Sequence, residues 1–122
     1  MMRQTTQNAT LVFKIATAAQ WASAVETGVF AGSIDDIRDG FIHLSAGEQL
    51  HGTLAKHFRG QSDLVLIAFT ASSLEPSLKW EVSRGGDLFP HLYAPLAAIH
   101  ALWVKPLTLD ANGIAQVPQD LS

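Results

Sequence analysis

The stretch LVLIAFT at residues 64–70 decides how this sequence is expected to fold. Seven consecutive residues without a charge are typical of a central strand that is covered on both faces, although the run by itself also fits a buried helix segment. Such a strand needs neighbours within a sheet and a layer of structure on each side. The segments before and after it predict both.

The segment before it begins with a strand that runs into a helix. LVFKI at residues 11–15 is a short strand-forming run, and Thr17 with Gln20 forms the capping-box pattern of a helix start. Gly28 stands where a helix ends in a left-handed residue. The polar segment 29–40 is rich in Gly, Ser and Asp, and we expect a turn-rich connection there.

A second strand-to-helix unit follows. FIHL at residues 41–44 is a brief strand, and Ser45-Ala46-Gly47-Glu48 is a second capping-box pattern that opens a helix to about Phe58. This places a helix N-terminus directly after a strand.

The segments after the central run predict mostly strands. LKWEV at residues 78–82 alternates between apolar and charged positions, and 99–104 is apolar on both faces. An Asn-Gly turn within 107–117 favours a hairpin. FPHLYAP at residues 89–95 is expected to be a stiff loop, because its two prolines lack a backbone donor and restrict their neighbours.

This order predicts an α+β fold with a mostly antiparallel sheet and two helices from the N-terminal half. With 122 residues the chain is expected to form a single domain over 1–122, with a core from about 10 to 117. Both ends, up to about Asn8 and from Pro118 to Ser122, are expected to be loose.

Composition excludes several functional classes. The absence of cysteine excludes thiolate nucleophiles and zinc sites built on cysteine. A net charge of −3, with 8 scattered Lys and Arg residues, makes nucleic acid an unlikely partner. No apolar run approaches the ~20 residues of a membrane span, and the N-terminal stretch lacks the apolar segment of a secretory signal. We therefore expect a cytoplasmic protein without membrane contact and of undetermined oligomeric state.

The first candidate site is the junction of strand 41–44 with the helix after it. A helix N-terminus stabilises phosphate or another anion, with Ser45 at the cap and His43 beside it as a donor or proton carrier. The alternative is that Ser45 only caps its helix and His43 is an ordinary hydrogen-bonded residue of the sheet.

The second candidate is Glu81 with Trp80 and Arg84. Alternation places Glu81 on the strand face opposite Trp80, where it is available as a general base, to stabilise a developing cation or to bind ribose hydroxyls. The alternative is a solvated face of charged side chains that contributes little.

The third candidate is the proline-braced segment 89–95. Its aromatic side chains are suited to packing on a flat ring, and His91 and the Tyr93 hydroxyl supply polar contacts. The alternative is that these side chains close the edge of the core.

Three motifs in this order, FIHLSAGEQ, LKWE and FPHLYAPL, resemble a small bacterial family known as domain of unknown function 952. The resemblance spans about residues 10–108 and includes Trp80, Glu81, His91 and Tyr93. The family is grouped by fold with the ADP-ribosyltransferases.

The His-Leu-Ser element is also similar to one in the NAD-dependent RNA 2′-phosphotransferases. That resemblance implies an ADP-ribosyltransferase-like fold in which His43 and Ser45 face the phosphate and ribose of a nucleotide. NAD is then the candidate cofactor.

Three functions fit these residues. In ADP-ribosyl transfer, His43 and Ser45 hold phosphate or ribose, His91 and Tyr93 pack on a ring, and Glu81 stabilises the cationic carbon or activates the acceptor. A non-catalytic module would bind a nucleotide or another small anionic metabolite in the same cleft. A metal-dependent hydrolase would need His43, His91 and Glu81 to converge within about 2.0 to 2.2 Å of one metal ion.

Overall fold

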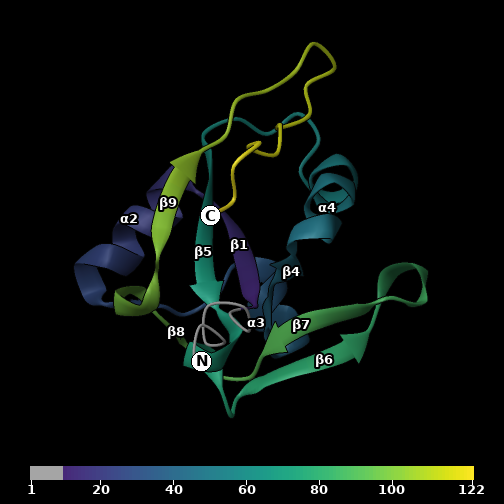
Figure 1. The fold of residues 1–122 in the computed structure, drawn as a ribbon. Coiled ribbons are helices and arrows are strands. Elements are labelled where there is room, and N and C mark those ends of the chain that lie inside the picture. Colours follow the sequence, from purple (N-terminus) through teal and green to yellow (C-terminus); the bar gives the residue numbers. More distant parts are fainter. Residues whose placement is uncertain (1–9) are drawn as a thin grey trace, which may run out of the picture.

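Strands β1 (Leu11–Thr17) and β5 (Leu64–Thr70) pair antiparallel along their full lengths at the centre of the fold (Figure 1). This computed structural model describes residues 10–122. The expected loose N-terminal segment therefore lies outside the described residues. The interpretation of 64–70 as a central strand is confirmed.

The other elements follow the chain in short segments. They are the helices α2 (Ala18–Thr27), α3 (Ile34–Asp39) and α4 (Leu50–His57), the strands β2 (Val29–Phe30), β3 (Ile42–His43), β4 (Ser45–Ala46), β6 (Leu78–Val82), β7 (Leu88–Leu92), β8 (Leu96–Ala97) and β9 (Trp103–Pro106), and the 3-10 turns η1 (Gly47–Gln49), η2 (Ala71–Leu74), η3 (Arg84–Gly86) and η4 (Ala98–His100).

The strands form three antiparallel sheets in the order β4-β1-β5-β9, β3-β7-β6 and β2-β8. The fold is thus a small α+β domain with mostly antiparallel strands and three short helices among the described residues. None of these helices is long and apolar enough to cross a membrane.

Two apolar clusters cover the two faces of the four-stranded sheet. Alternate residues of β5 divide between them, so that Ile67 packs on the side of α2 and Leu66 on the side of α4, both fully buried. Figure 1 shows α2 and α4 on opposite sides of β1 and β5. Burying one such side chain contributes about 1.5–3 kcal/mol, so these layers hold the sheet rigid beneath the site. In the C-terminal segment expected to be loose, Leu121 packs against the second cluster.

The first helix begins and ends as predicted. The Thr17 hydroxyl accepts a hydrogen bond from the Gln20 N–H at 3.0 Å, and the Gln20 side chain accepts one from the Thr17 N–H at 2.9 Å. Gly28 ends the helix with φ of 93°, a left-handed conformation that glycine adopts without strain.

The segment 29–40 differs from the expected turn-rich connection. It contains β2 and α3, and α3 starts with its own capping box. The Ser33 hydroxyl accepts from the Asp36 N–H at 3.2 Å, and the Asp36 carboxylate accepts from the Ser33 N–H at 2.8 Å. A Ser-x-x-Asp pattern was sufficient to start this helix, where Glu or Gln is usual.

The predicted cap at Ser45 is wrong. Ser45 lies in β4 and pairs with Phe13 of β1. The turn η1 begins two residues later, and the Ala46 N–H donates instead to the Gln49 side chain at 2.9 Å. The strand therefore continues past the position at which the helix was expected to open.

Three C-terminal predictions need correction as well. The expected loop 89–95 is largely strand β7, the middle strand of its sheet. Pro90 is tolerated there because β3 ends at His43, and the Pro90 carbonyl still accepts from the Leu44 N–H at 3.1 Å. The predicted strand 99–104 starts only at Trp103, because η4 occupies its first part. The predicted hairpin within 107–117 is reduced to one bridge between Leu109 and Ala115.

Candidate functional site

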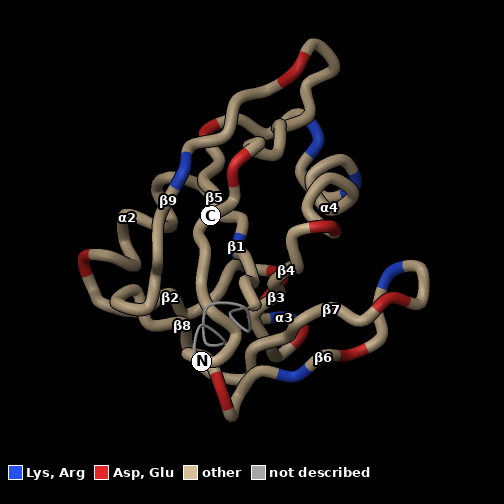
Figure 2. Tube along the Cα trace, viewed as in Figure 1, with Lys and Arg blue, Asp and Glu red and all other residues tan. Residues whose placement is uncertain are grey.

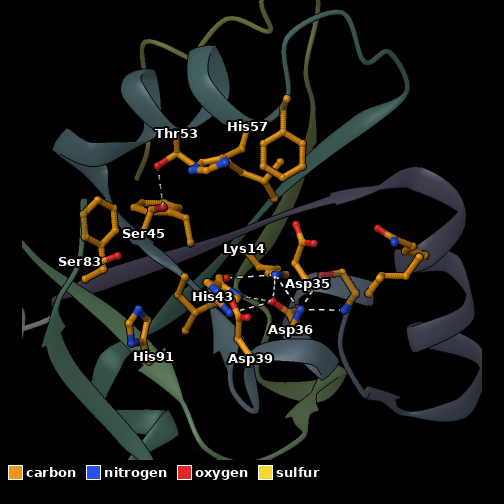
Figure 3. A pocket seen from close by; sticks show the side chains of 18 of the residues that line it. Lys14, Asp35, Asp36, Asp39, His43, Ser45, Thr53, His57, Ser83 and His91 are labelled. Carbon is orange, nitrogen blue, oxygen red and sulfur yellow. Dashed lines mark hydrogen bonds and ion pairs between the residues drawn. The ribbon is translucent and has the colours of Figure 1, made fainter. Parts of the chain in front are cut away.

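A pocket of about 480 Å³ lies between β1, α3, α4 and the sheet β3-β7-β6. Four predicted site residues line it, namely His43, Ser45, Arg84 and His91. Figure 3 shows His57 and Thr53 on one side of the pocket, with His43, Asp36 and Asp39 on the other. The structure thus brings His43 and Ser45 of the first candidate site and His91 of the third to the same pocket.

The register of the three-stranded sheet explains this meeting. His43 of β3 stands opposite His91 of β7, so both side chains lie on one face of the sheet. Glu81 and Tyr93 share that face but lie outside the pocket lining. Trp80 pairs with Pro90 on the opposite face and is 38% exposed. The predicted binding role of Trp80 therefore has no support from this pocket.

The His43 imidazole is held between two aspartates of α3. Its Nδ1 lies 2.7 Å from Asp36 Oδ1, and its Nε2 lies 2.9 Å from Asp39 Oδ2. Hydrogen bonds from Arg38 keep the pKa of Asp39 below its ordinary value. Because ionised carboxylates only accept, both contacts are hydrogen bonds at the same time only when both ring nitrogens of His43 carry hydrogen.

Asp36 is the centre of a buried polar network. Burial raises the pKa of Asp36, but the hydrogen bond from His43 and the charge of Lys14 outweigh it and hold that pKa well below its ordinary value. Lys14 Nζ donates to Asp36 Oδ2 at 2.9 Å and to the His43 carbonyl at 3.0 Å. The network ties β1, α3 and β3 together at the edge of the pocket.

His91 is held by a different carboxylate. Its Nδ1 lies 2.8 Å from Glu81 Oε1, and the Tyr93 hydroxyl donates to the same oxygen at 2.7 Å. The hydrogen bonds from Tyr93 and His91 lower the pKa of Glu81. An ionised Glu81 requires a hydrogen on His91 Nδ1, which leaves the Nε2 lone pair of a neutral imidazole free. Within residues 10–122, that Nε2 makes no hydrogen bond.

Phe41 packs among the aromatic rings of this face. Its ring stacks on His91 with 4.0 Å between centroids and an angle of 23°, and it lies 4.5 Å from the His43 ring. The two imidazole centroids are 5.8 Å apart. Phe41 therefore fixes the ring planes of both histidines.

Arg84 forms the opposite wall of the pocket. Its guanidinium lies 4.9 Å from the centre of the Phe89 ring and donates to the Thr53 hydroxyl at 3.3 Å. The Ser45 hydroxyl lies 3.5 Å from the same Thr53 oxygen. Of the Lys and Arg side chains that line the pocket, Lys14 and Arg38 are paired with aspartates, whereas Arg84 has no carboxylate partner among residues 10–122. This wall presents a free cation beside two hydroxyls.

The metal-site hypothesis does not fit this geometry. It required His43, His91 and Glu81 to converge, but each histidine uses Nδ1 on a carboxylate of its own. Over the part of the chain that the structure describes, no group of three or more His, Cys, Asp or Glu side chains is placed to hold a metal ion.

Sequence reasoning missed Lys14, Asp36, Phe41 and Thr53. A lysine at an inward-facing position of a buried strand is a signal, because a buried ammonium needs an acidic partner. The Ser-x-x-Asp pattern at residues 33–36 would have placed that partner at a helix start. Nothing in the sequence marked Phe41 or Thr53, which depend on the tertiary arrangement.

Comparison with solved structures finds close relatives of this fold. The crystal structure of protein CC0527 from Caulobacter crescentus is 53% identical, covers 88% of this chain and 94% of its own, and superposes with a TM-score of 0.86. The solution NMR structure of CC0527 is 53% identical over 87% of this chain and 91% of its own, with a TM-score of 0.79. A comparison with curated proteins finds no match. Residues 15–104 match a sequence family, and the chain belongs to that family, which is described as "Protein of unknown function (DUF952)".

Proposed function

We propose that the pocket binds a small phosphate- or ribose-bearing ligand such as a nucleotide or an ADP-ribose-type molecule. One observation carries this proposal, namely the Arg84 guanidinium, which has no carboxylate partner among residues 10–122 and lies beside the hydroxyls of Thr53 and Ser45. The planar donor fork of arginine matches a phosphate, and bonds between charged groups are about twice as strong as neutral ones.

The size and lining of the pocket support a ligand of this kind. Its volume of about 480 Å³ falls within the range of roughly 300–1,000 Å³ typical of small-molecule sites. Phe13, Phe58 and Phe89 contribute apolar surface for a sugar or a base. Figure 2 shows Lys and Arg dispersed over separate elements, which favours a small ligand over a nucleic-acid backbone.

The geometry supports binding more directly than ADP-ribosyl transfer by Glu81. The Glu81 carboxylate lies outside the pocket lining and is occupied by His91 and Tyr93. The resemblance of the fold to ADP-ribosyltransferases stays a prediction, as do the use of NAD and the cytoplasmic location.

The test is ligand-dependent stabilisation with a matched pair of variants. Inorganic phosphate, ribose 5-phosphate, ADP-ribose and NAD are added to the wild type, and unfolding and calorimetric binding are measured. A ligand present at 100 times its Kd stabilises the fold by about 2.7 kcal/mol. Arg84→Ala is expected to weaken binding about 10- to 100-fold, from the loss of a charged hydrogen bond of about 1.5–3 kcal/mol.

Arg59→Ala is the control, because Arg59 is exposed and lies outside the pocket lining. Equal affinity of Arg84→Ala and the wild type would refute the proposal, and so would the absence of stabilisation by every one of these compounds. Release of nicotinamide from NAD would instead establish the transferase alternative.

A further inference from the structure

We infer that His91 and His43 act as a general base and a general acid that hydrolyse a small phosphodiester bound in this pocket. The inference rests on the proposed function, because it needs a phosphate held by Arg84. It adds a reaction to that binding site and assigns the two protons that the reaction must move.

The two histidines are built alike and face the same hollow. Each contacts a carboxylate through Nδ1, at 2.7 Å for His43 and 2.8 Å for His91. The Nε2 of His91 makes no hydrogen bond within residues 10–122, whereas the Nε2 of His43 lies 2.9 Å from the half-exposed Asp39 carboxylate. Their centroids are 5.8 Å apart with 67° between the ring planes, and both line the pocket. A phosphodiester between them would have its attacking and leaving oxygens near different imidazoles.

Their surroundings assign opposite proton-transfer roles. His43 contacts Asp36 and Asp39 at once, and only a ring with hydrogen on both nitrogens can donate to both, which suits His43 to act as the acid. His91 contacts one carboxylate through Nδ1, and its Nε2 has no partner within residues 10–122, so a neutral ring presents a lone pair there and is suited to act as the base. Environments that separate two titratable groups in this way are characteristic of acid–base pairs in enzymes.

The charge of the pocket wall that Arg84 forms favours a phosphodiester over a phosphate monoester. Arg84 is the cation of this wall without a carboxylate partner in the described part of the chain, while burial and the nearby charges of Arg84 and Lys56 lower the pKa of His57. One positive charge matches the single negative charge of a phosphodiester. A phosphate monoester carries two negative charges, and one of them would have no positive partner on this wall.

The reaction adds water across one P–O ester bond. His91 Nε2 takes a proton from water as the water oxygen bonds to phosphorus. The bond between phosphorus and the leaving oxygen breaks. His43 Nε2 gives that oxygen the proton that it otherwise shares with Asp39 at 2.9 Å, and the Asp39 carboxylate stays paired with Arg38. The products are a phosphate monoester and an alcohol, and transfer of the extra proton from His91 to solvent and uptake of one by His43 restore the pair.

Glu81 is a positioning residue in this scheme. It reaches the substrate only through His91, and Tyr93 holds it in place. The amide of Glu81→Gln carries no charge and can donate as well as accept, so hydrogen on His91 Nδ1 is no longer enforced, and we expect kcat to fall by at least about tenfold with KM unchanged. If Glu81 had only a structural role, kcat would not fall selectively while KM stayed unchanged.

The experiment uses bis(p-nitrophenyl) phosphate and a 2′,3′-cyclic nucleotide as diester probes and p-nitrophenyl phosphate as the monoester, all in the presence of a chelator. We expect turnover of the diesters in preference to the monoester. His91→Ala and His43→Ala are each expected to lose at least about 100-fold of kcat. His51→Ala is the control, because His51 is an exposed histidine that lies outside the pocket lining.

His43→Gln keeps an amide donor for Asp36, so this variant tests the acid even if His43→Ala does not fold. Binding of phosphate or ADP-ribose without turnover of either diester would overturn this inference and leave the proposed function standing. Turnover that is unchanged in His91→Ala, or that is confined to the monoester, would also overturn it. Failure of all phosphate compounds to bind would refute both.

Discussion

The two histidine–carboxylate pairs of the pocket are opposite in burial. In the pair on α3 and β3, the Asp36 side chain is 2% exposed and the His43 side chain 38%. In the pair on β6 and β7, the Glu81 side chain is 39% exposed and the His91 side chain 7%. The same contact therefore buries the carboxylate in one case and the imidazole in the other.

This difference separates what holds the fold from what faces a ligand. Asp36 accepts hydrogen bonds from Ser33, His43 and Lys14, which lie on three separate segments of the chain. Glu81 accepts from His91 and Tyr93 on a neighbouring part of the chain, and β6 and β7 are already joined by their backbone pairing. Loss of Asp36 leaves a buried charge without its partner, whereas loss of Glu81 does not.

The largest effect is expected from Asp36→Ala. The variant leaves the Lys14 ammonium buried without its counter-charge, and breaking a buried pair in this way costs about 3–5 kcal/mol. Urea unfolding followed by circular dichroism measures the loss. Asp35→Ala, on the same helix but 67% exposed, is the control and is expected to change stability by about 1 kcal/mol or less.

A loss for Asp36→Ala that is no larger than that for Asp35→Ala would contradict the assignment of a structural role to the buried network. Glu81→Ala extends the comparison, and it is expected to cost clearly less than Asp36→Ala in the same assay.

A second, smaller effect is a loss of stability in acid that depends on Asp36. The folded protein holds the pKa of Asp36 below its value of about 3.9 in the unfolded chain. The stabilisation is therefore complete above pH ~4 and is lost as the pH falls below that value toward the folded pKa. The difference in unfolding free energy between the wild type and Asp36→Asn is expected to shrink between pH 5 and about pH 2. A difference that stays constant over this range would show that Asp36 does not titrate in this way.

The sequence predicted the parts of the fold that local patterns determine. The central strand 64–70 and the helix that begins after Thr17 follow from an uncharged run and a capping box, and both are confirmed. The strand at 89–92 was missed because Pro90 argues against a strand, and only the short length of β3 makes it acceptable there. The cap at Ser45 failed because pairing with β1 outweighed a local signal of about 1 kcal/mol.

The candidate site was predictable only in part, for a related reason. His43, Ser45, Arg84 and His91 were singled out by residue type, and the pocket joins them through a strand register that no sequence pattern encodes. The role of Glu81 changed because its carboxylate contacts His91 and lies outside the pocket lining. Long-range pairing thus decides which polar residues meet.

The smallest effect is expected from Tyr93→Phe, which also gives the sharpest test of the Glu81–His91 pair. The Tyr93 hydroxyl makes the leading contribution to the lowered pKa of Glu81, and the pKa of Tyr93 is itself raised by Glu81. Removing the hydroxyl leaves the ring in place beside Phe41, so the pKa of Glu81 should rise toward its ordinary value while His91 still donates. Carbon-detected NMR titration of the Glu81 carboxyl group measures this change. An unchanged pKa would mean that His91 alone keeps Glu81 ionised and that the Tyr93 hydroxyl plays no part in it.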